Sequence, residues 1–253
     1  MKVGVFISAM LVSLSASAIC PNSATSRAPI AVIIDDLGYS QELAHSALAL
    51  EQPIALSILP NTPFAFDIAQ MAATRGKEVL IHLPMQAVIP AAEEPAMMRD
   101  SDSPATTQQL VEQALRQIPG AVGVNNHMGS ALTANPIMMT RLMSILDDHE
   151  LFFVDSRTSA DTIAAESARL AGLKQTSRNV FLDNDLEPAK VAASLERLLA
   201  AARSQGGALA IGHPHEVTFS ALSLLAQSLP EDIVWVSVDE LIDCQSTART
   251  STP

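Results

Sequence analysis

Short apolar runs rich in Ile and Val alternate along the chain with longer Ala- and Leu-rich segments. Short apolar runs bounded by turn residues predict buried strands, whereas apolar residues recurring every three or four positions predict helices. The predicted strands are residues 30–34, 54–59, 78–83, 121–124, 151–154, 179–182, 208–211 and 233–238. The predicted helices lie near residues 40–50, 64–75, 106–118, 136–149, 161–171, 188–204 and 217–228.

Strands that alternate with helices indicate parallel strands joined by helical crossovers. The chain has 253 residues, close to the ~250 residues that are usual for a (β/α) barrel. We therefore predict an α/β fold, a barrel of seven or eight mostly parallel strands, in preference to an open sheet. The Pro-rich segment 86–105 is too long for a simple turn, and we expect it to fold over one end of the barrel.

The two ends of the chain differ from the segment between them. Lys2, the apolar stretch that follows it and Ala16-Ser17-Ala18 form the pattern of a cleavable signal peptide over residues 1–18. Residues 19–29 are expected to be a linker and residues 244–253 a flexible tail, which leaves 30–243 as the barrel domain. We expect a periplasmic or secreted protein, without stable membrane insertion.

The net charge limits which partners the protein can bind, and the two cysteines bear on the compartment in which it works. A formal net charge of -12 argues against nucleic acid, a polyanion that attracts Lys- and Arg-rich faces. Protein partners stay unknown. Cys20 and Cys244 are the two cysteines. In an exported protein they either form a disulfide that ties the two ends or remain separate thiols, and both readings are open.

Polar residues whose side chains could take part in catalysis or ligand binding follow the predicted strands. In parallel α/β folds the carboxyl ends of the strands form the rim at which ligands bind. For Asp183 and Asp185 we favour a simpler role, capping the following helix, and for Asp155 both roles stay open. The residues are Asp35, Asp36, Asn61, His82, Asn125, Asn126, His127, Asp155, Ser156, Arg157, Asp183, His213 and His215.

Four of the six histidines lie at this rim together with the aspartate pair. A catalytic zinc takes about three protein N or O ligands and leaves a position for water, so the set indicates a metal site. One carboxylate of the pair can bind the cation, and the other can act as the base for a water molecule. The alternative is that the histidines are buried polar residues with satisfied hydrogen bonds.

The motifs IIDDLG, RGKEVLIHLPM, GVNNHMGS, FFVDSRT, FLDND and IGHPH together resemble the divergent polysaccharide deacetylases, a branch of the NodB-type deacetylase superfamily. The resemblance covers about residues 29–242. It implies a distorted (β/α) barrel with a divalent metal, usually zinc, that removes N- or O-acetyl groups from a polysaccharide.

The resemblance also implies roles for single residues. Asp35 corresponds to the catalytic base and Asp36 to a metal ligand, and His213 or His215 stands at the place of the general acid. The family's His-x-x-x-His is altered, because His82 is followed at that spacing by Gln86. We expect His127 to replace the missing ligand.

The resemblance leaves the substrate contacts and the activity open. We expect Asn126 and Asp155 near the substrate, and Arg157 either to orient the base or to hold a substrate carboxylate. The leading expectation is a deacetylase acting on a cell-envelope glycan such as peptidoglycan. The alternatives are another metal-dependent glycan hydrolase and a non-catalytic glycan-binding or regulatory protein.

Overall fold

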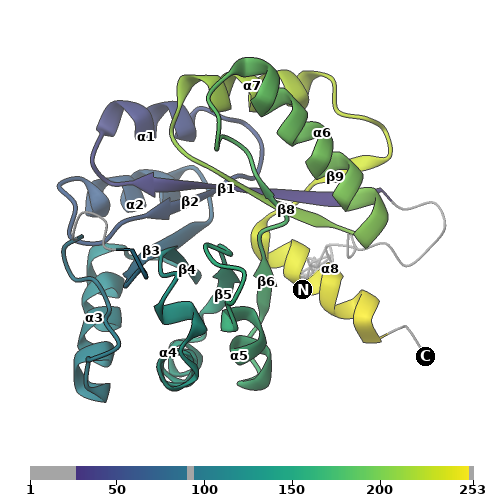
Figure 1. Cartoon of the computed structure of the whole chain (residues 1–253). Helices are drawn as coiled ribbons and strands as arrows, with labels where there is room; N and C mark the ends of the chain where they lie inside the picture. The colour runs from purple at the N-terminus through teal and green to yellow at the C-terminus, as the bar shows by residue number, and fades with distance from the viewer. Residues whose placement is uncertain (1–26, 90–93, 251–253) are drawn as a thin grey trace, which may run out of the picture.

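The computed structural model describes residues 27–89 and 94–250 (Figure 1). The predicted signal peptide and Cys20 lie outside the described residues, so the structure tests neither the cleavage site nor the pairing of Cys20 with Cys244. Within the described residues, no helix is both long enough and apolar enough to cross a membrane.

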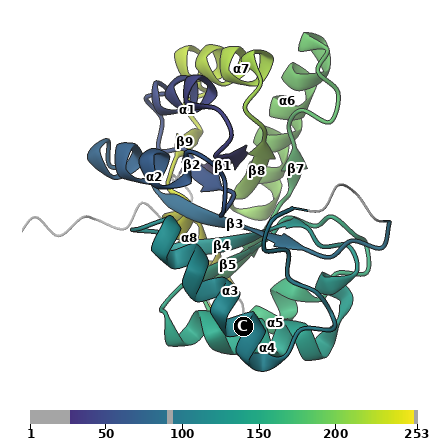
Figure 2. The same cartoon turned by 90° about the vertical axis from the view of Figure 1, so that its left-hand side faces the viewer.

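Nine strands form one parallel sheet in the order β6-β5-β4-β3-β2-β1-β8-β7, with β9 beside β1. The strands are β1 (Ala28–Leu37), β2 (Ala55–Ile58), β3 (Val79–Met85), β4 (Gly123–Met128), β5 (Phe152–Asp155), β6 (Gln175–Ser177), β7 (Val180–Phe181), β8 (Ala208–Gly212) and β9 (Ile233–Trp235). The sheet curls (Figures 1 and 2), which confirms the predicted distorted barrel. Its order ends at β6 and β7, and no strand pairing joins these two within the described part of the chain.

The helices follow the predicted segments closely, with one addition at the C-terminal end. They are α1 (Gln41–Leu48), α2 (Ala65–Thr74), α3 (Pro104–Gln117), α4 (Pro136–Asp148), α5 (Ala164–Leu170), α6 (Pro188–Gln205), α7 (Glu216–Gln227) and α8 (Val238–Thr250). A 3-10 turn, η1 (Leu132–Ala134), precedes α4.

Alternate residues of each strand pack on opposite faces of the sheet. In β1, Ile30, Val32 and Ile34 belong to the large core that the sheet shares with α1 to α7, whereas Ala31 and Ile33 face the interior of the curl. In Figure 1, α8 lies below β1 and α1, α6 and α7 lie above it. Leu241 and Ile242 of α8 belong to the inner cluster, so α8 fills the inside of the curled sheet.

The segment from residue 244, expected to be a flexible tail, is helical up to Thr250. Cys244 is 2% exposed, so α8 is still packed against the protein two residues beyond Ile242. The hydroxyl groups of Ser246 and Thr247 donate to the carbonyl oxygens of Ile242 and Asp243, one turn earlier in the helix.

The described part of the segment 86–105 lies along the carboxyl end of the sheet. Met98 forms a parallel bridge with Met85 at the end of β3, and Glu94 accepts a hydrogen bond of 2.8 Å from the hydroxyl of Tyr39, which follows β1. The segment therefore reaches from β3 to β1 across the rim that carries the predicted site, in agreement with the expected position over one barrel end.

Candidate metal centre and active site

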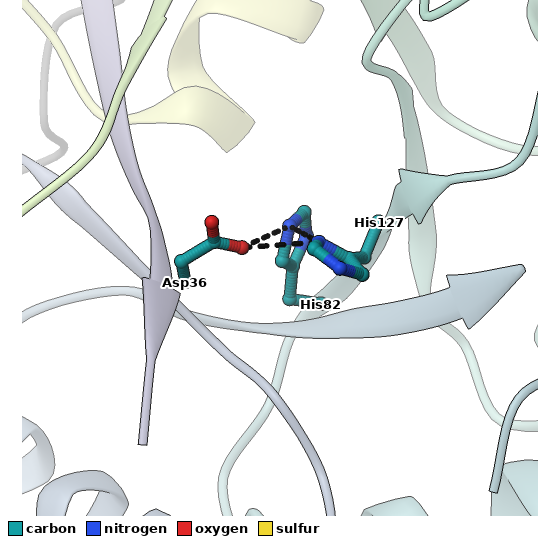
Figure 3. Close-up of side chains that lie close together, drawn as sticks. All are labelled: Asp36, His82 and His127. Atoms are coloured by element: carbon teal, nitrogen blue, oxygen red, sulfur yellow. Dashed lines mark hydrogen bonds and ion pairs between the residues drawn. The ribbon is translucent and has the colours of Figure 1, made fainter. Parts of the chain in front are cut away.

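Three side chains from three strands converge at the rim (Figure 3). Asp36 Oδ1 lies 3.2 Å from His82 Nε2 and 3.0 Å from His127 Nδ1, and the two ring nitrogens are 3.1 Å apart. These are the three residues that the sequence predicted as metal ligands, and within the described residues they form a group able to hold a metal ion.

A bulge in β1 brings two adjacent carboxylates to the same site. The register between β1 and β2 shifts between Ile34 and Leu37, and Asp36 has a left-handed backbone with φ of 56°. Regular strand alternation would send Asp35 and Asp36 to opposite faces. The bulge removes that alternation, so Asp35 and Asp36 both lie near His82 Nε2, at 3.6 Å and 3.2 Å.

Asn125 orients both His82 and Asp35. Its amide nitrogen donates to Asp35 Oδ1 and Oδ2 at 2.9 and 3.1 Å, so its oxygen is the acceptor. That oxygen lies 3.0 Å from His82 Nδ1 and accepts from Ser57 Oγ at 2.6 Å. His82 must then carry its proton on Nδ1, which leaves the lone pair of Nε2 directed toward Asp36 and His127.

The donor set fits a divalent cation such as zinc. Ligand atoms about 2.0–2.1 Å from a tetrahedral zinc lie about 3.3 Å from one another, close to the 3.0–3.2 Å observed here. Asp36 Oδ1 is buried and has no hydrogen-bond donor within the described residues. A buried carboxylate oxygen without a donor is costly, and a bound cation would compensate for it.

The pKa shifts of Asp36 and His82 also favour a bound cation at this site. Burial opposes the ionisation of Asp36, yet the contacts with His127 and His82 hold the pKa of its carboxyl far below the ordinary value. Burial likewise opposes a charged His82, but Asp35 and Asp36 raise the pKa of His82. The pocket thus stabilises a positive charge among these side chains, whether a proton or a metal ion supplies it.

His213 lies beside this centre and is held by Asp183. His213 Nδ1 is 3.0 Å from Asp183 Oδ1, and the backbone N–H of His213 and the hydroxyl of Thr218 donate to Asp183 Oδ2. His213 Nε2 lies 3.7 Å from Asp36 Oδ2. Although burial lowers it, the pKa of His213 is raised overall by Asp183, Asp35 and Asp36.

The helix-capping role expected for Asp183 is therefore wrong. No side-chain hydrogen bond caps the N-terminus of α6, which begins at Pro188, and the Asp183 carboxylate instead joins β7 to the loop after β8 and to α7. Asp185 does accept from the backbone N–H of Glu187 just before α6, as a local capping residue would.

His215 and Gln86 lie apart from the ligand cluster. The side chain of His215 is exposed at the start of α7, and its ring centroid is 6.4 Å from that of His213. Gln86 Oε1 accepts from the backbone N–H of Asp100, so its amide serves the segment that crosses the rim.

Asn126 and Asp155 are engaged within the protein. Asn126 Oδ1 accepts from the N–H of Ser156, and its amide donates to the carbonyl oxygen of Met128. Asp155 accepts from the N–H of Arg157 and the hydroxyl of Thr162. These bonds join β4 to the loop after β5.

Arg157, by contrast, has an exposed side chain. Asp35 interacts electrostatically with Arg178, a residue that the sequence did not single out. Asn125 was among the polar residues expected at the rim, and strand alternation places it on the same face of β4 as His127, two residues away. Neither Arg178 nor the role of Asp183 carries a comparable signal, because both depend on how the end of the sheet folds around residues 178–183.

Comparisons with known proteins agree with this architecture. A family model described as divergent polysaccharide deacetylase matches residues 32–242. The uncharacterized protein YibQ of Escherichia coli K12 is 36% identical over 224 residues, which is 88% of this chain and 70% of that protein. An uncharacterized protein of Haemophilus influenzae is 37% identical over 212 residues, 84% of this chain and 76% of that protein.

Solved structures share the fold. The uncharacterized protein ATU2773 of Agrobacterium tumefaciens C58 superimposes with a TM-score of 0.81 at 21% identity, over 88% of this chain and 93% of that one. The catalytic domain of peptidoglycan N-acetylglucosamine deacetylase from Eubacterium rectale gives a TM-score of 0.54 at 16% identity, over 88% of this chain and 94% of that one. The fold, the match over residues 32–242 and the two sequence relatives lead to one assignment: this chain belongs to the divergent polysaccharide deacetylase family.

Proposed function

We propose that this protein is a metal-dependent hydrolase that removes acetyl groups from a cell-envelope polysaccharide such as peptidoglycan. The observation that carries the proposal is the convergence of Asp36, His82 and His127, with Asp35 and His213 beside them. Membership of the family supports the substrate class. The proposed cofactor is a divalent cation, most simply zinc, held by Asp36, His82 and His127.

Asp35 is the proposed base. It is 3% exposed, and the two hydrogen bonds from Asn125 fix its carboxylate within 3.6 Å of His82 Nε2. When bound, the cation supplies a Lewis acid that polarises the acetyl carbonyl and makes water more acidic. Asp35 then accepts a proton from the water that attacks the carbonyl carbon.

His213 is the proposed acid. Its Nδ1 faces Asp183 and its Nε2 faces Asp36, and these carboxylates raise the pKa of His213 although burial lowers it, which favours the protonated ring. His213 Nε2 donates a proton to the departing amine or alkoxide as its bond to the acetyl carbon breaks. Acetate and the deacetylated sugar are the products, and the two proton transfers balance.

We also propose that the protein works in the periplasm or is secreted after cleavage near Ala18. The signal-peptide pattern of residues 1–18 supports this location, and peptidoglycan lies in the same compartment. Mass spectrometry of protein from the envelope fraction tests it, and an intact Met1 on that protein would contradict it.

The activity is tested by measuring acetate released from peptidoglycan and from N-acetylated oligosaccharides, with zinc-loaded and with metal-free protein. We expect acetate only from the metal-loaded form, and a loss of about 100-fold or more in Asp35→Asn. Metal-loaded protein that binds these glycans but releases no acetate would overturn the proposal in favour of a glycan-binding role. Cleavage of the glycan chain without acetate would indicate another metal-dependent hydrolase.

A further inference from the structure

Two arginines line an open hollow at the seam where the curled sheet does not close. The hollow has a volume of about 470 Å³ and lies between the loop after β5, the link from β6 to β7, and α6. We call it the arginine hollow. Among the residues that the structure describes, no Asp or Glu lines it, although the chain has 27 acidic and 15 basic residues. Its polar lining includes Arg157, Ser177, Arg178, Asn179 and Gln205.

The backbone of Arg157 is held in a conformation that favours glycine. Its φ is 51°, and hydrogen bonds fix it on both sides, from its N–H to Asp155 Oδ1 and from Arg178 Nη2 to its carbonyl oxygen. Glycine would adopt this conformation with less strain. Within the described residues the Arg157 guanidinium has no hydrogen bond or ion pair. Arg157 lines both this hollow and a neighbouring one that includes Asp155 and Glu166.

Arg178 is half-buried and adds a second positive charge. Its Nε donates to the carbonyl oxygen of Ser156 at 2.7 Å, and its guanidinium lies 5.1 Å from the centre of the Phe181 ring. Burial lowers the pKa of Arg178 and the like charge of Arg157 lowers it further. Two guanidinium groups thus repel each other in a hollow without a lining carboxylate.

The acidic side chains on the far side of Arg157 are already engaged. Asp155 accepts from Thr162 and from the backbone of Arg157, and Glu166 forms two hydrogen bonds with Arg169. Neither carboxylate lines the arginine hollow. Asp155 and Asp35 partly offset the charge of Arg178, and the guanidinium of Arg157 remains available to an external anion.

Two short chains of contacts link the hollow to the proposed catalytic residues. Ser156, whose carbonyl oxygen binds Arg178, accepts a hydrogen bond through Oγ from Asn125, which holds Asp35. On the other side, the Phe181 ring beneath Arg178 lies 5.1 Å from the ring of His213. A ligand in the hollow would be separated from the acid and the base by about one layer of side chains.

We propose that the arginine hollow binds a carboxylate carried by a sugar unit of the polysaccharide, next to the unit that is deacetylated. This inference rests on the proposed function and narrows its substrate to an acidic glycan. A planar guanidinium matches a carboxylate through two parallel N–H···O bonds, and Arg157 retains its donors for that purpose.

The probe is a matched pair of glycan strands prepared from peptidoglycan. Strands stripped of their peptides expose the lactyl carboxylates of muramic acid, and conversion of these groups to primary amides removes the charge and keeps the shape. Binding of both strands is measured by calorimetry in the zinc-loaded Asp35→Asn background, in which turnover is expected to be at least about 100-fold slower. We expect the acidic strands to bind about tenfold to hundredfold more tightly than the amidated ones.

Arg157→Gly and Arg157→Gln test the assignment to this hollow, with Arg116→Gln as the control. Arg157→Gly relieves the backbone conformation, so its Tm should equal or exceed that of the parent while the preference for acidic strands disappears. Arg157→Gln should lose the same preference. Arg116 is 69% exposed on α3 and lies outside the hollow, so its variant should keep the preference.

Equal binding of both strands by the parent would overturn the proposal, as would a preference that survives both Arg157 variants. Acetate release is measured in parallel with protein that retains Asp35. A preference for acidic strands without acetate release would contradict the proposed deacetylase activity and support the carboxylate site. Acetate release with equal binding of both strands would support the deacetylase activity and contradict the carboxylate site.

Discussion

Asn125 Oδ1 accepts a hydrogen bond of 3.0 Å from Nδ1 of His82, and this contact sets which nitrogen of His82 is free to bind a metal. The same side chain holds Asp35 through its amide nitrogen. One buried amide therefore orients both a proposed metal ligand and the proposed base, and neither can change its orientation without disturbing the other.

Replacing Asn125 with Ala should weaken the fold and the site together. The change leaves His82, Asp35 and Ser57 without a shared buried partner, and each unsatisfied buried group costs about 1–3 kcal/mol. We expect a loss of about 2 kcal/mol or more in the free energy of unfolding, measured with denaturant, together with weaker zinc binding.

Ser57→Ala is the graded comparison for Asn125→Ala. It removes one of the two donors to Asn125 Oδ1 and leaves the contact with His82 in place. Its effect on zinc affinity should be clearly smaller. Equal zinc affinity in Asn125→Ala and in the unchanged protein would show that Asn125 does not orient His82.

Asp183→Asn should lower the pKa of His213. The negative charge of Asp183 favours the protonated ring, whose pKa is raised although burial opposes the charge. An acid must be protonated to act, so activity is lost as pH rises through that pKa. We expect the alkaline limb of kcat/KM to move to lower pH, and the NMR titration of His213 to move in the same direction.

His215→Ala is the control for Asp183→Asn, because the side chain of His215 is exposed and has no contact with Asp183. Its alkaline limb should stay where it is in the unchanged protein. A limb that moves in His215→Ala and not in Asp183→Asn would assign the acid to His215.

Gly38→Ala should disturb the turn that follows Asp36. Gly38 has φ of 132°, and a Cβ there would lie 2.1 Å from Thr62 Oγ1 and 3.2 Å from the carbonyl oxygen of Leu59. The turn must move, and Asp36 with it. We expect a clear fall in Tm and weaker zinc binding, measured by thermal unfolding and by competition with a chelator.

Gly76→Ala provides the matched comparison. Its φ is 62°, but nothing lies within 4 Å of the added Cβ, so the expected cost is the left-handed backbone alone, about 1–2 kcal/mol. Zinc affinity should not change. Equal zinc affinity in the two glycine variants would show that the turn at Gly38 does not position Asp36.

The order of strands and helices could be predicted because it leaves a direct pattern in the sequence, and the candidate ligand trio was predicted from the family resemblance together with the polar residues at the strand ends. Apolar runs indicated β1 to β5 and β7 to β9. Strand β6, the three polar residues Gln175–Ser177, carries no such pattern, because an edge strand of this length needs little apolar surface. The helical end of α8 depends on packing inside the curl, which is visible only after the sheet has formed.

The surroundings of the candidate metal centre were harder to predict than its candidate ligands. The position of Asp183 before α6 predicts a helix cap. Asp183 lies beside His213 only because the sheet curls. The expectation that Asn126 and Asp155 lie near the substrate stays a prediction, and their hydrogen bonds fasten neighbouring loops. A polar residue at a strand end can serve either purpose, and sequence position does not distinguish the two.

The central claim is that Asp36, His82 and His127 form the metal centre, with His127 in place of the ligand that the family's second histidine would supply. Zinc content per chain, measured by mass spectrometry after dialysis against metal-free buffer, tests it directly. The unchanged protein and Gln86→Ala should each retain about one zinc per chain, whereas Asp36→Ala, His82→Ala and His127→Ala should be largely empty. Zinc retained in His127→Ala but lost in Gln86→Ala would contradict the account.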